Sequence, residues 1–452
     1  MSTVHSHTAG KRILFASFPA DGHFNPLTGL AVFLAGQGYD VRWYTSKSYA
    51  AKLEQLKIPH YPFRKAVDVS NGDFDAVFPG RSSKKTQLGK LKFDLLHAFI
   101  LRTPEYYTDL LAIYREFPFD ILVADCAFTA IPLVKDAMGI PVVAIGVLPL
   151  ISSSKDLAPN GMGMEPSYTF SGKIKQALLR AFAGRLIFKQ ANKVMRQLLE
   201  EYHISCRSKN AFDIIVEKAD VLLQSGAPGF EYKRSDMPRH VHFIGPLLPQ
   251  PPDDFSNQWF DERLNRFSRV VLVTQGTVEK DVTKLIVPAL EAFKNSNTLV
   301  VCTTGGSQTA DLRKRYPHPN IIIEDFIPFN DVMPYADACI TNGGYGGVLL
   351  AIENNLPLVV AGMHEGKNEI CARVGYFKLG INLKTEKPIP LQIRQAAEEV
   401  INNPQYKENV AALAADFQYY DSNALCAGHI ARLLKTTVIR KAGKRWLLQK
   451  AW

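Results

Sequence analysis

A glycine-rich turn that follows a predicted strand indicates anion binding. The apolar run 338–341 predicts a strand, Asn342 follows it, and helix-forming residues continue from Val348. Four of the next five residues after Asn342 are glycines: Gly343, Gly344, Gly346 and Gly347. Glycines at such a turn let backbone N–H groups approach a ligand closely, and the N-terminus of the following helix carries partial positive charge. The segment therefore predicts a phosphate or diphosphate site, with a purely structural turn as the alternative.

A histidine and an aspartate follow two other predicted strands and form a candidate acid–base pair. His23 comes after the first strand, between Gly22 and Pro26, and we expect a helix to begin at about Leu27. Ligands of open α/β folds bind at this edge of the sheet, and an imidazole suits a general base near neutral pH. Asp125 ends a strand expected beside the first, where its carboxylate could orient the imidazole and stabilise its protonated form. The structural alternatives are that His23 is merely exposed and that Asp125 caps the following helix.

Two strand ends in the second half supply groups that suit the rest of a nucleotide. After one predicted strand, Thr274, Gly276 and Thr277 offer hydroxyl and amide groups to phosphate. After another, Phe326 could stack on a base, and the backbone of Ile327 could read its edge. Because these strand ends meet the glycine-rich turn at one edge of the predicted sheet, we expect a single ligand to contact all of them.

Polar residues at two more positions complete the candidate site. The segment 362–369 follows a predicted strand, and its Lys367 and Asn368 are candidate contacts to the same ligand. An ordinary capped helix start is the alternative for this segment.

Short apolar runs alternate with helical patterns along the whole chain, which indicates parallel sheets buried on both faces. The predicted strands are 13–18, 41–45, 121–124, 142–147, 221–224, 270–274, 299–303, 321–324, 338–341, 358–361 and 381–383. The proline-rich segment 245–254 divides the chain into halves, each the size of one doubly wound domain, which disfavours a single large sheet. We therefore expect an N-terminal Rossmann-like domain over 1–245, a linker over 246–260 and a second such domain over 261–423.

The extra segment 149–210 in the first half begins with a loop rich in Ser, Pro, Gly and Met and continues in helical patterns. Its side chains either line the space between the domains or cover the first sheet.

Composition excludes several classes of protein. The chain has 452 residues, of which 46% are hydrophobic and 21% charged, as in ordinary globular proteins. We expect a cytoplasmic enzyme, because no apolar run has the length of a transmembrane helix and the first ten residues do not resemble a signal peptide. Six scattered cysteines favour reduced thiols and no zinc site. The net charge of +10 is diffuse and accompanies no nucleic-acid-binding module, so nucleic acid is not an expected partner.

In this order, these features resemble those of the family 1 glycosyltransferases of the GT-B fold over residues 11–434. The resemblance implies an α/β protein with two Rossmann-like, doubly wound domains facing a cleft. It also implies a final helix, 424–437 here, that crosses back to the first domain. In that family a histidine after the first strand is the acceptor base and a later aspartate orients it. These positions correspond to His23 and Asp125. Asp21 and Phe24 flank this histidine, so the resemblance implies that they lie in the neighbourhood of the acceptor or the sugar.

The chain departs from the family pattern in the second domain. Phe326 stands where the base-stacking Trp is usual, and Phe329 replaces a Gln. Asn342 replaces the diphosphate-binding His, and Gly347 replaces a Ser. The resemblance still implies that the donor-binding residues are those of the glycine-rich turn and the neighbouring strand ends.

Further departures bear on the donor. Leu350 stands where a ribose-binding Glu is usual. A donor without a 2′-hydroxyl would lose little binding from this change, because it has no such hydroxyl for the Glu to bind. Lys367 and Asn368 replace the Asp-Gln pair that binds glucose hydroxyls, which fits a 6-deoxy sugar. An unpaired buried polar group costs about 1–3 kcal/mol, so such a site should discriminate measurably between sugars.

A narrower likeness extends to bacterial flavonoid (polyphenol) rhamnosyltransferases, on the segments 18–30, 123–128, 274–280 and 364–370. It implies inverting transfer from dTDP-β-L-rhamnose, preferred over UDP-sugars, to a hydroxyl of a flavonoid or other polyphenol. Neither a cofactor nor a metal is expected if backbone amides and a helix N-terminus stabilise the leaving diphosphate. The alternatives are UDP-glucose-dependent transfer to an antibiotic or lipid-like acceptor, a sugar-nucleotide epimerase, and a silent binding protein. The sequence does not indicate an oligomeric state.

The last residues, 438–452, form a basic tail beyond what the fold needs. Its segment 440–452 combines five cations with Trp446, Leu447, Leu448 and Trp452. Packing on the protein or fraying in solvent is the expected behaviour. Peripheral contact with an anionic membrane is the alternative.

Overall fold

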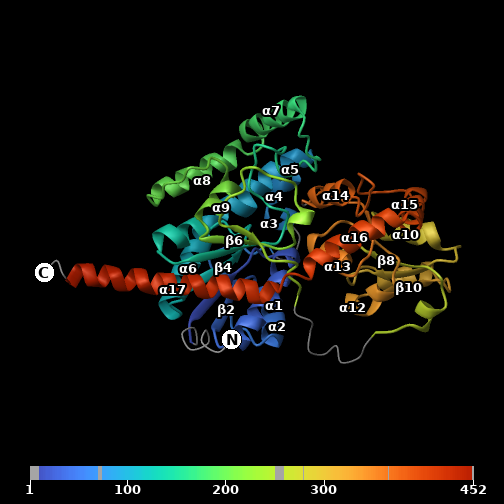
Figure 1. Ribbon diagram of the computed structural model, residues 1–452, viewed down its shortest axis with the longest axis horizontal. Helices are drawn as coiled ribbons and strands as arrows, with labels where there is room; N and C mark the ends of the chain where they lie inside the picture. Colours follow the sequence, from blue (N-terminus) through green and yellow to red (C-terminus); the bar gives the residue numbers. More distant parts are fainter. Residues whose placement is uncertain (1–9, 70–73, 250–258, 278, 365, 450–452) are drawn as a thin grey trace.

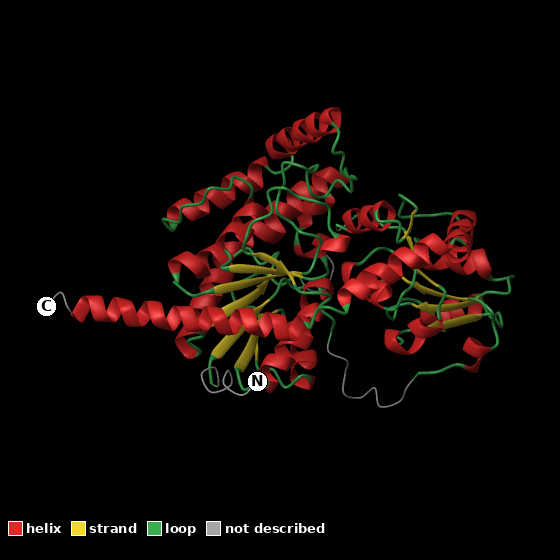
Figure 2. Ribbon diagram, viewed as in Figure 1, coloured by secondary structure: helices red, strands yellow, loops and turns green. Residues whose placement is uncertain are grey.

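Two parallel β-sheets with helices on both faces form the body of the protein (Figure 1). The computed structural model describes residues 10–69, 74–249, 259–277, 279–364 and 366–449. The sheets lie on either side of the predicted linker 246–260, part of which falls outside the described residues. Figure 2 shows the strands as two distinct groups within this helical cover.

Within the described residues, the first sheet has seven strands in the order β3-β2-β1-β4-β5-β6-β7. They are β1 (Arg12–Ala16), β2 (Asp40–Thr45), β3 (His60–Pro62), β4 (Ile121–Asp125), β5 (Val142–Gly146), β6 (Val221–Gln224) and β7 (Val241–Phe243). The second has six, in the order β10-β9-β8-β11-β12-β13. They are β8 (Val270–Thr274), β9 (Leu299–Thr303), β10 (Ile321–Glu324), β11 (Ala338–Thr341), β12 (Leu358–Val360) and β13 (Gly380–Asn382). All neighbouring strands in both sheets pair in parallel.

Helices connect these strands and cover both faces of each sheet. In the first half they are α1 (Asp21–Gly36), α2 (Ala50–Gln55), α3 (Phe74–Val77), α4 (Pro79–Ser82), α5 (Gln87–Asp94), α6 (Thr103–Glu116), α7 (Phe170–Leu186), α8 (Lys189–Glu201) and α9 (Ala211–Lys218). In the second they are α10 (Ile286–Phe293), α11 (Thr309–Arg315), α12 (Phe329–Val332), α13 (Tyr345–Glu353), α14 (Lys367–Tyr376), α15 (Pro390–Asn402), α16 (Pro404–Phe417) and α17 (Ser422–Gln449).

Alternate residues of each central strand enter different cores. In β1, Ile13 and Phe15 pack with α1 and α17, whereas Leu14 and Ala16 pack with residues of α6. Successive side chains of a strand point to opposite faces, so both faces of this sheet are buried. This double burial explains why the strands are continuous apolar runs in the sequence.

All eleven predicted strands are present, with ends displaced by at most two residues. The prediction missed β3 and β7, which are three residues long and lie at opposite edges of the first sheet. Each of them contains a histidine, and β3 also contains Pro62, so neither forms a continuous apolar run.

The strand order reverses at one point in each sheet, between β1 and β4 and between β8 and β11. In open α/β sheets, ligands bind beyond the carboxyl ends of the strands at such switch points. β4 ends at Asp125, and β1 leads into the helix that holds His23. β8 ends at Thr274, and β11 leads into Asn342. The candidate segments therefore lie at the two switch points.

The final helix, α17, crosses back to the first half of the molecule (Figure 1). Its Cys426, Ile430 and Leu434 are buried in the core formed by β1, β2 and α1. The helix continues to Gln449, so most of the predicted tail is a continuation of α17 that extends past the sheets. Residues 450–452 lie outside the described part of the chain. No helix within that part is long and apolar enough to cross a membrane.

The extra segment 149–210 forms α7 and α8 and the loop before them. α8 packs through Met195, Leu198 and Leu199, which are buried in a satellite core of the first domain. α7 is far more exposed and lies at the outer end of this domain in Figure 1. The preceding loop reaches α14 of the second domain, so the segment also bridges the two halves.

Candidate active site

The predicted histidine–aspartate pair is formed. His23 Nδ1 lies 2.7 Å from Asp125 Oδ1, and the aspartate side chain is completely buried. His23 sits in the first turn of α1, which begins at Asp21 and not near Leu27 as predicted. The prediction placed the start of the helix after Pro26, but this proline lies inside α1. Proline is tolerated here because its fixed φ suits a helix and costs only one hydrogen bond, close to the N-terminus.

Two backbone amides fix the Asp125 carboxylate. Phe18 N–H donates to Oδ2 at 2.6 Å, and Ala127 N–H donates to Oδ1 at 2.8 Å. A carboxylate held this way orients the imidazole so that Nδ1 carries the proton. His23 Nε2 has no hydrogen-bond partner among the described residues, and 13% of the side chain is exposed. The arrangement can accept a proton from a substrate at Nε2 and stabilise the resulting positive charge.

The two residues expected beside the base behave differently. Phe24 is fully buried, with its ring stacked on Tyr49 at 4.1 Å between centroids. It therefore supports α1 from the core, and its side chain does not contact a ligand directly, although the sequence predicts it in the neighbourhood of the acceptor or the sugar. The reason is that α1 begins before Phe24, earlier than predicted. Helical periodicity then puts Phe24 and Leu27 on the side of the helix that faces the core.

Asp21 connects the two halves of the molecule. Its Oδ1 accepts a hydrogen bond from Tyr49 Oη at 3.1 Å, and its Oδ2 accepts one from Thr277 Oγ1. Burial, followed by the charge of Asp21, raises the pKa of Tyr49, so the phenol keeps its proton and donates it. The contact places the first turn of α1 against the loop after β8. The predicted catalytic and donor-binding segments are thus brought together.

The glycine-rich turn has the geometry of an anion site. α13 begins at Tyr345, three residues before the predicted start, and Gly344 is its N-cap. The buried ring of Tyr345 explains the early start, because its hydroxyl donates to the Ser225 carbonyl at 2.7 Å and anchors the first turn. Gly346 and Gly347 therefore belong to the first turn of the helix and not to a loop.

Close packing does not explain most of these glycines. A Cβ atom added at Gly344, Gly346 or Gly347 would have no neighbour within 4 Å. Open space at a helix N-terminus leaves room for an anion. Gly343 differs, because its φ is +83° and a Cβ there would lie 2.5 Å from Cys371 Sγ. Gly343 is thus required by the backbone, and the other three leave space for a ligand.

The remaining phosphate candidates already have protein partners. Asn342 Nδ2 donates to the carbonyl of Gln275, which ties the turn after β11 to the loop after β8. Thr274 Oγ1 accepts from Gly276 N–H at 3.3 Å, and Gly276 has a φ of +73°. The Thr277 hydroxyl is occupied by Asp21. The structure therefore brings these predicted residues together, with their side chains engaged in the protein.

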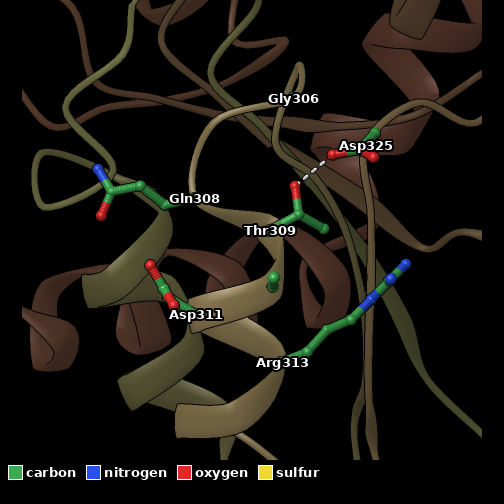
Figure 3. Close-up of a pocket in the computed structure, with 7 residues that line it drawn as sticks. Gly306, Gln308, Thr309, Asp311, Arg313 and Asp325 are labelled. Atoms are coloured by element: carbon green, nitrogen blue, oxygen red, sulfur yellow. Dashed lines mark hydrogen bonds between the residues drawn. The ribbon is translucent and has the colours of Figure 1, made fainter.

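Phe326 is placed as a base-stacking residue would be. Its ring is 62% exposed, whereas Ile327 beside it is buried, so only the backbone of Ile327 could contact a base. A cavity of about 350 Å³ lies at the ends of β9 and β10, lined by Gly306 and by residues of α11 (Figure 3). In this cavity Thr309 Oγ1 donates to Asp325 Oδ1.

Lys367 and Asn368 lie in the first turn of α14, at the contact between the halves. Asn368 Nδ2 donates to the carbonyl of Gly161 at 2.7 Å. Glu369 Oε1 accepts from the N–H groups of Gly161 and Gly163, both at 2.8 Å. Residues 161–163 of the loop before α7 therefore lie against the first turn of α14, where the sugar-binding residues were predicted. We call these three residues the strap.

A buried ion-pair cluster beneath this strap was not predicted. Arg373 pairs with Glu231 at 2.6 Å and with Glu369 at 3.1 Å, and Arg234 lies 3.5 Å from Glu231. Burial opposes ionisation of Glu231, but the positive charges of Arg373 and Arg234 outweigh it and lower its pKa. The i, i+4 spacing of Glu369 and Arg373 was visible in the sequence. Their partner Glu231, 142 positions from Arg373, was not.

Comparison with known proteins identifies the family. The family model described as UDP-glucoronosyl and UDP-glucosyl transferase matches residues 108–418. The chain belongs to this family. As a family 1 glycosyltransferase it binds a nucleotide sugar and a small-molecule acceptor. The predicted GT-B fold is likewise confirmed.

Relatives of this glycosyltransferase align over nearly its whole length. It is 35% identical to 4'-demethylrebeccamycin synthase of Lentzea aerocolonigenes over 414 residues, 91% of this chain and 97% of the relative. It is 31% identical to UDP-glucosyltransferase 1 of Beauveria bassiana (strain ARSEF 2860) over 428 residues, 88% and 90% of the two chains. The solved glycotransferase of kitacinnamycin shares the fold with a TM-score of 0.73 at 18% identity, covering 94% of this chain and 99% of that one.

Proposed function

We propose that this glycosyltransferase moves a sugar to a hydroxyl of a planar aromatic acceptor with inversion at the anomeric carbon. The observation that carries the proposal is the His23–Asp125 pair. The buried carboxylate engages Nδ1 and leaves Nε2 available to an acceptor. A base in this state can remove the acceptor proton as its oxygen attacks the sugar.

The chemical step breaks one bond and forms another at the anomeric carbon. The acceptor oxygen bonds to this carbon from the face opposite the diphosphate, and its proton passes to His23 Nε2. The bond between the anomeric carbon and the diphosphate oxygen breaks, and its electron pair stays with the diphosphate. Asp125 stabilises the imidazolium that forms.

The leaving diphosphate is bound at the first turn of α13. Backbone N–H groups at residues 343–347, together with the positive end of the helix, stabilise the charge that develops on its oxygens. The open space beside Gly344, Gly346 and Gly347 supports this placement. Thr277 and Asn342 join these amides once their present hydrogen bonds are exchanged for bonds to the donor.

The donor we propose is dTDP-β-L-rhamnose, with a flavonoid or related polyphenol as acceptor. Leu350, half-buried on α13, provides no carboxylate for a ribose 2′-hydroxyl. Lys367 and Asn368 replace the glucose-binding pair of the family, and Asn368 already donates its amide to Gly161. Both features favour a deoxyribose nucleotide and a 6-deoxy sugar.

Glucosyl transfer from UDP-glucose is the second candidate. It is favoured by the family description and by the UDP-glucosyltransferase name of a relative that is 31% identical. A further relative is named for rebeccamycin, which favours a natural product other than a flavonoid as acceptor.

Kinetics with four donors separate these candidates. We expect kcat/KM with one flavonol to be highest for dTDP-rhamnose, followed by UDP-rhamnose, dTDP-glucose and UDP-glucose. A clear preference for UDP-glucose would overturn the rhamnosyl proposal and leave the base and the fold unaffected. NMR of the product tests the stereochemistry, because retention at the anomeric carbon would contradict the single-displacement step.

A further inference from the structure

Helix α7 presents a row of large apolar side chains to solvent. The row consists of Phe170, Ile174, Leu178, Phe182 and Leu186, which are between 47% and 83% exposed. Residues four apart form a continuous ridge on an α-helix, so these side chains make one surface and not five separate ones. A continuous exposed apolar surface marks a site of interaction, whereas scattered exposed apolar residues do not.

The packing of α7 is the reverse of that of an ordinary surface helix. Its inward side buries Gln176, whose amide donates to the carbonyls of Asp156 and Ser167 and accepts from Ser167 N–H. Ala183 is the other buried residue of the helix. These hydrogen bonds fix the rotation of α7 about its own axis. The apolar ridge is therefore held outward by the fold.

The charge around this ridge has one sign. Residues 166–199 contain seven Lys and Arg and no Asp or Glu, while the whole chain has a net charge of +10. Lys173, Lys175 and Arg185 on α7 are exposed and form no ion pair within the described part of the chain. α5 lies toward the same end of this domain in Figure 1 and adds exposed Leu88 and Leu91 within another basic segment, 81–93.

We propose that α7 docks this enzyme on an anionic lipid surface. Helices with an apolar face and basic residues on the remaining surface lie in the plane of a membrane interface, with the apolar side chains among the upper acyl chains. The cations then contact anionic headgroups. Charge complementarity selects this partner over a second copy, because a dimer through α7 would place two basic surfaces in contact. The proposal is independent of the donor and the acceptor.

A vesicle assay with the full chain tests the apolar part of the proposal. Vesicles of phosphatidylcholine with phosphatidylglycerol should sediment the enzyme, and vesicles of phosphatidylcholine alone should do so far less. The double variant Leu178→Asp, Phe182→Asp should bind more weakly by roughly tenfold or more. The matched control Leu391→Asp changes an equally exposed leucine on α15 and should bind like the parent. Circular dichroism and the thermal midpoint verify that each variant is folded.

Charge reversal tests the electrostatic part. The variant Lys173→Glu, Lys175→Glu should bind anionic vesicles more weakly by roughly tenfold or more at low salt, and the difference should shrink as salt is added. The control Lys407→Glu, on exposed α16, should have little effect. A chain that ends at Thr437 lacks the end of α17 and keeps α7, so it distinguishes the contributions of these two segments to vesicle binding. We expect this shortened chain to keep most of the binding.

Several outcomes would overturn the proposal. One is that the parent enzyme fails to bind anionic vesicles, and another is that α7 variants bind as well as the controls. Loss of binding in the chain ending at Thr437, with the α7 variants unaffected, would assign the membrane contact to the tail. A dimer in analytical ultracentrifugation that Leu178→Asp dissociates would make this surface an interface between copies.

Discussion

The two halves of the candidate active site differ in what their polar groups do before a ligand binds. On the N-terminal side, Asp125 has its partners, and His23 Nε2 has no hydrogen-bond partner among the described residues. On the C-terminal side, Asn342, Thr277 and Asn368 all donate to protein oxygens. The proposed base is thus preorganised, whereas a donor bound at the proposed site must exchange existing hydrogen bonds for its own. We infer that changes to the N-terminal half act mainly on kcat and changes to the C-terminal half mainly on the KM of the donor.

The base should give the largest effect. His23→Ala should lower kcat by about 10²–10⁴-fold, because proton transfer to a positioned base contributes that much. The donor Kd, measured by calorimetry, should change little, since His23 belongs to the other half of the site. Asp125→Asn should lower kcat in the same direction. Full activity of His23→Ala on an unactivated hydroxyl would exclude the proposed mechanism.

The buried ion pair beneath the strap should give the largest effect on stability. Arg373→Ala leaves the buried Glu231 carboxylate with two backbone N–H donors and the more distant Arg234. Removing one partner of a buried ion pair costs about 3–5 kcal/mol. The control Arg394→Ala breaks a half-exposed i, i+4 pair with Glu398 and should cost less than about 0.5 kcal/mol. The midpoints of urea unfolding measure both. Similar midpoints would show that the cluster does not hold α14 in place.

The same cluster predicts a pH dependence. The pKa of Glu231 is lower in the folded protein than its ordinary value. At a pH between these two pKa values, the folded state therefore binds fewer protons than the unfolded state. Its contribution is complete above the ordinary pKa of glutamate and is lost as the pH falls through the lowered pKa. We expect Glu231→Gln to have lower stability than the parent at neutral pH and a smaller loss on acidification. Parallel curves of unfolding midpoint against pH would contradict this assignment.

The C-terminal half should show smaller effects, on KM. Asn342→Ala removes a proposed contact to the diphosphate and the bond to the Gln275 carbonyl, so the donor KM should rise by roughly tenfold. kcat should fall much less. The control Asn354→Ala lies at the other end of α13 and should leave KM unchanged. An effect confined to kcat would place Asn342 with the base and not with the donor.

The bridge between the halves should give the smallest effect. Thr277→Val removes the hydroxyl that donates to Asp21. The donor KM should rise by about two- to fivefold, because one modest hydrogen bond to the donor is lost. Thr277→Ser keeps the hydroxyl and should restore the parent KM. If Thr277→Val lowered KM, the bond to Asp21 would be competing with the donor more strongly than the hydroxyl helps it.

The sequence by itself determined the strands, the glycine-rich turn and the candidate pair of His23 and Asp125. Continuous apolar runs identify strands buried on both faces, and His23 and Asp125 follow two of them at the carboxyl edge. These signals are local: each depends on residue type and on the distance to the nearest strand end. The contact between His23 and Asp125 is present in the structure. The resemblance to family 1 glycosyltransferases added the GT-B fold, which is confirmed.

Only the tertiary structure decided how these segments meet. Phe24 is a core residue because α1 begins at Asp21, and Tyr345 starts α13 early because its hydroxyl reaches the carbonyl of Ser225 in the other half. The pairing of Arg373 with Glu231 joins residues 142 positions apart. The outward apolar ridge of α7 likewise depends on hydrogen bonds that bury Gln176. Burial and long-range contacts are properties of the packed chain, and no local pattern specifies them.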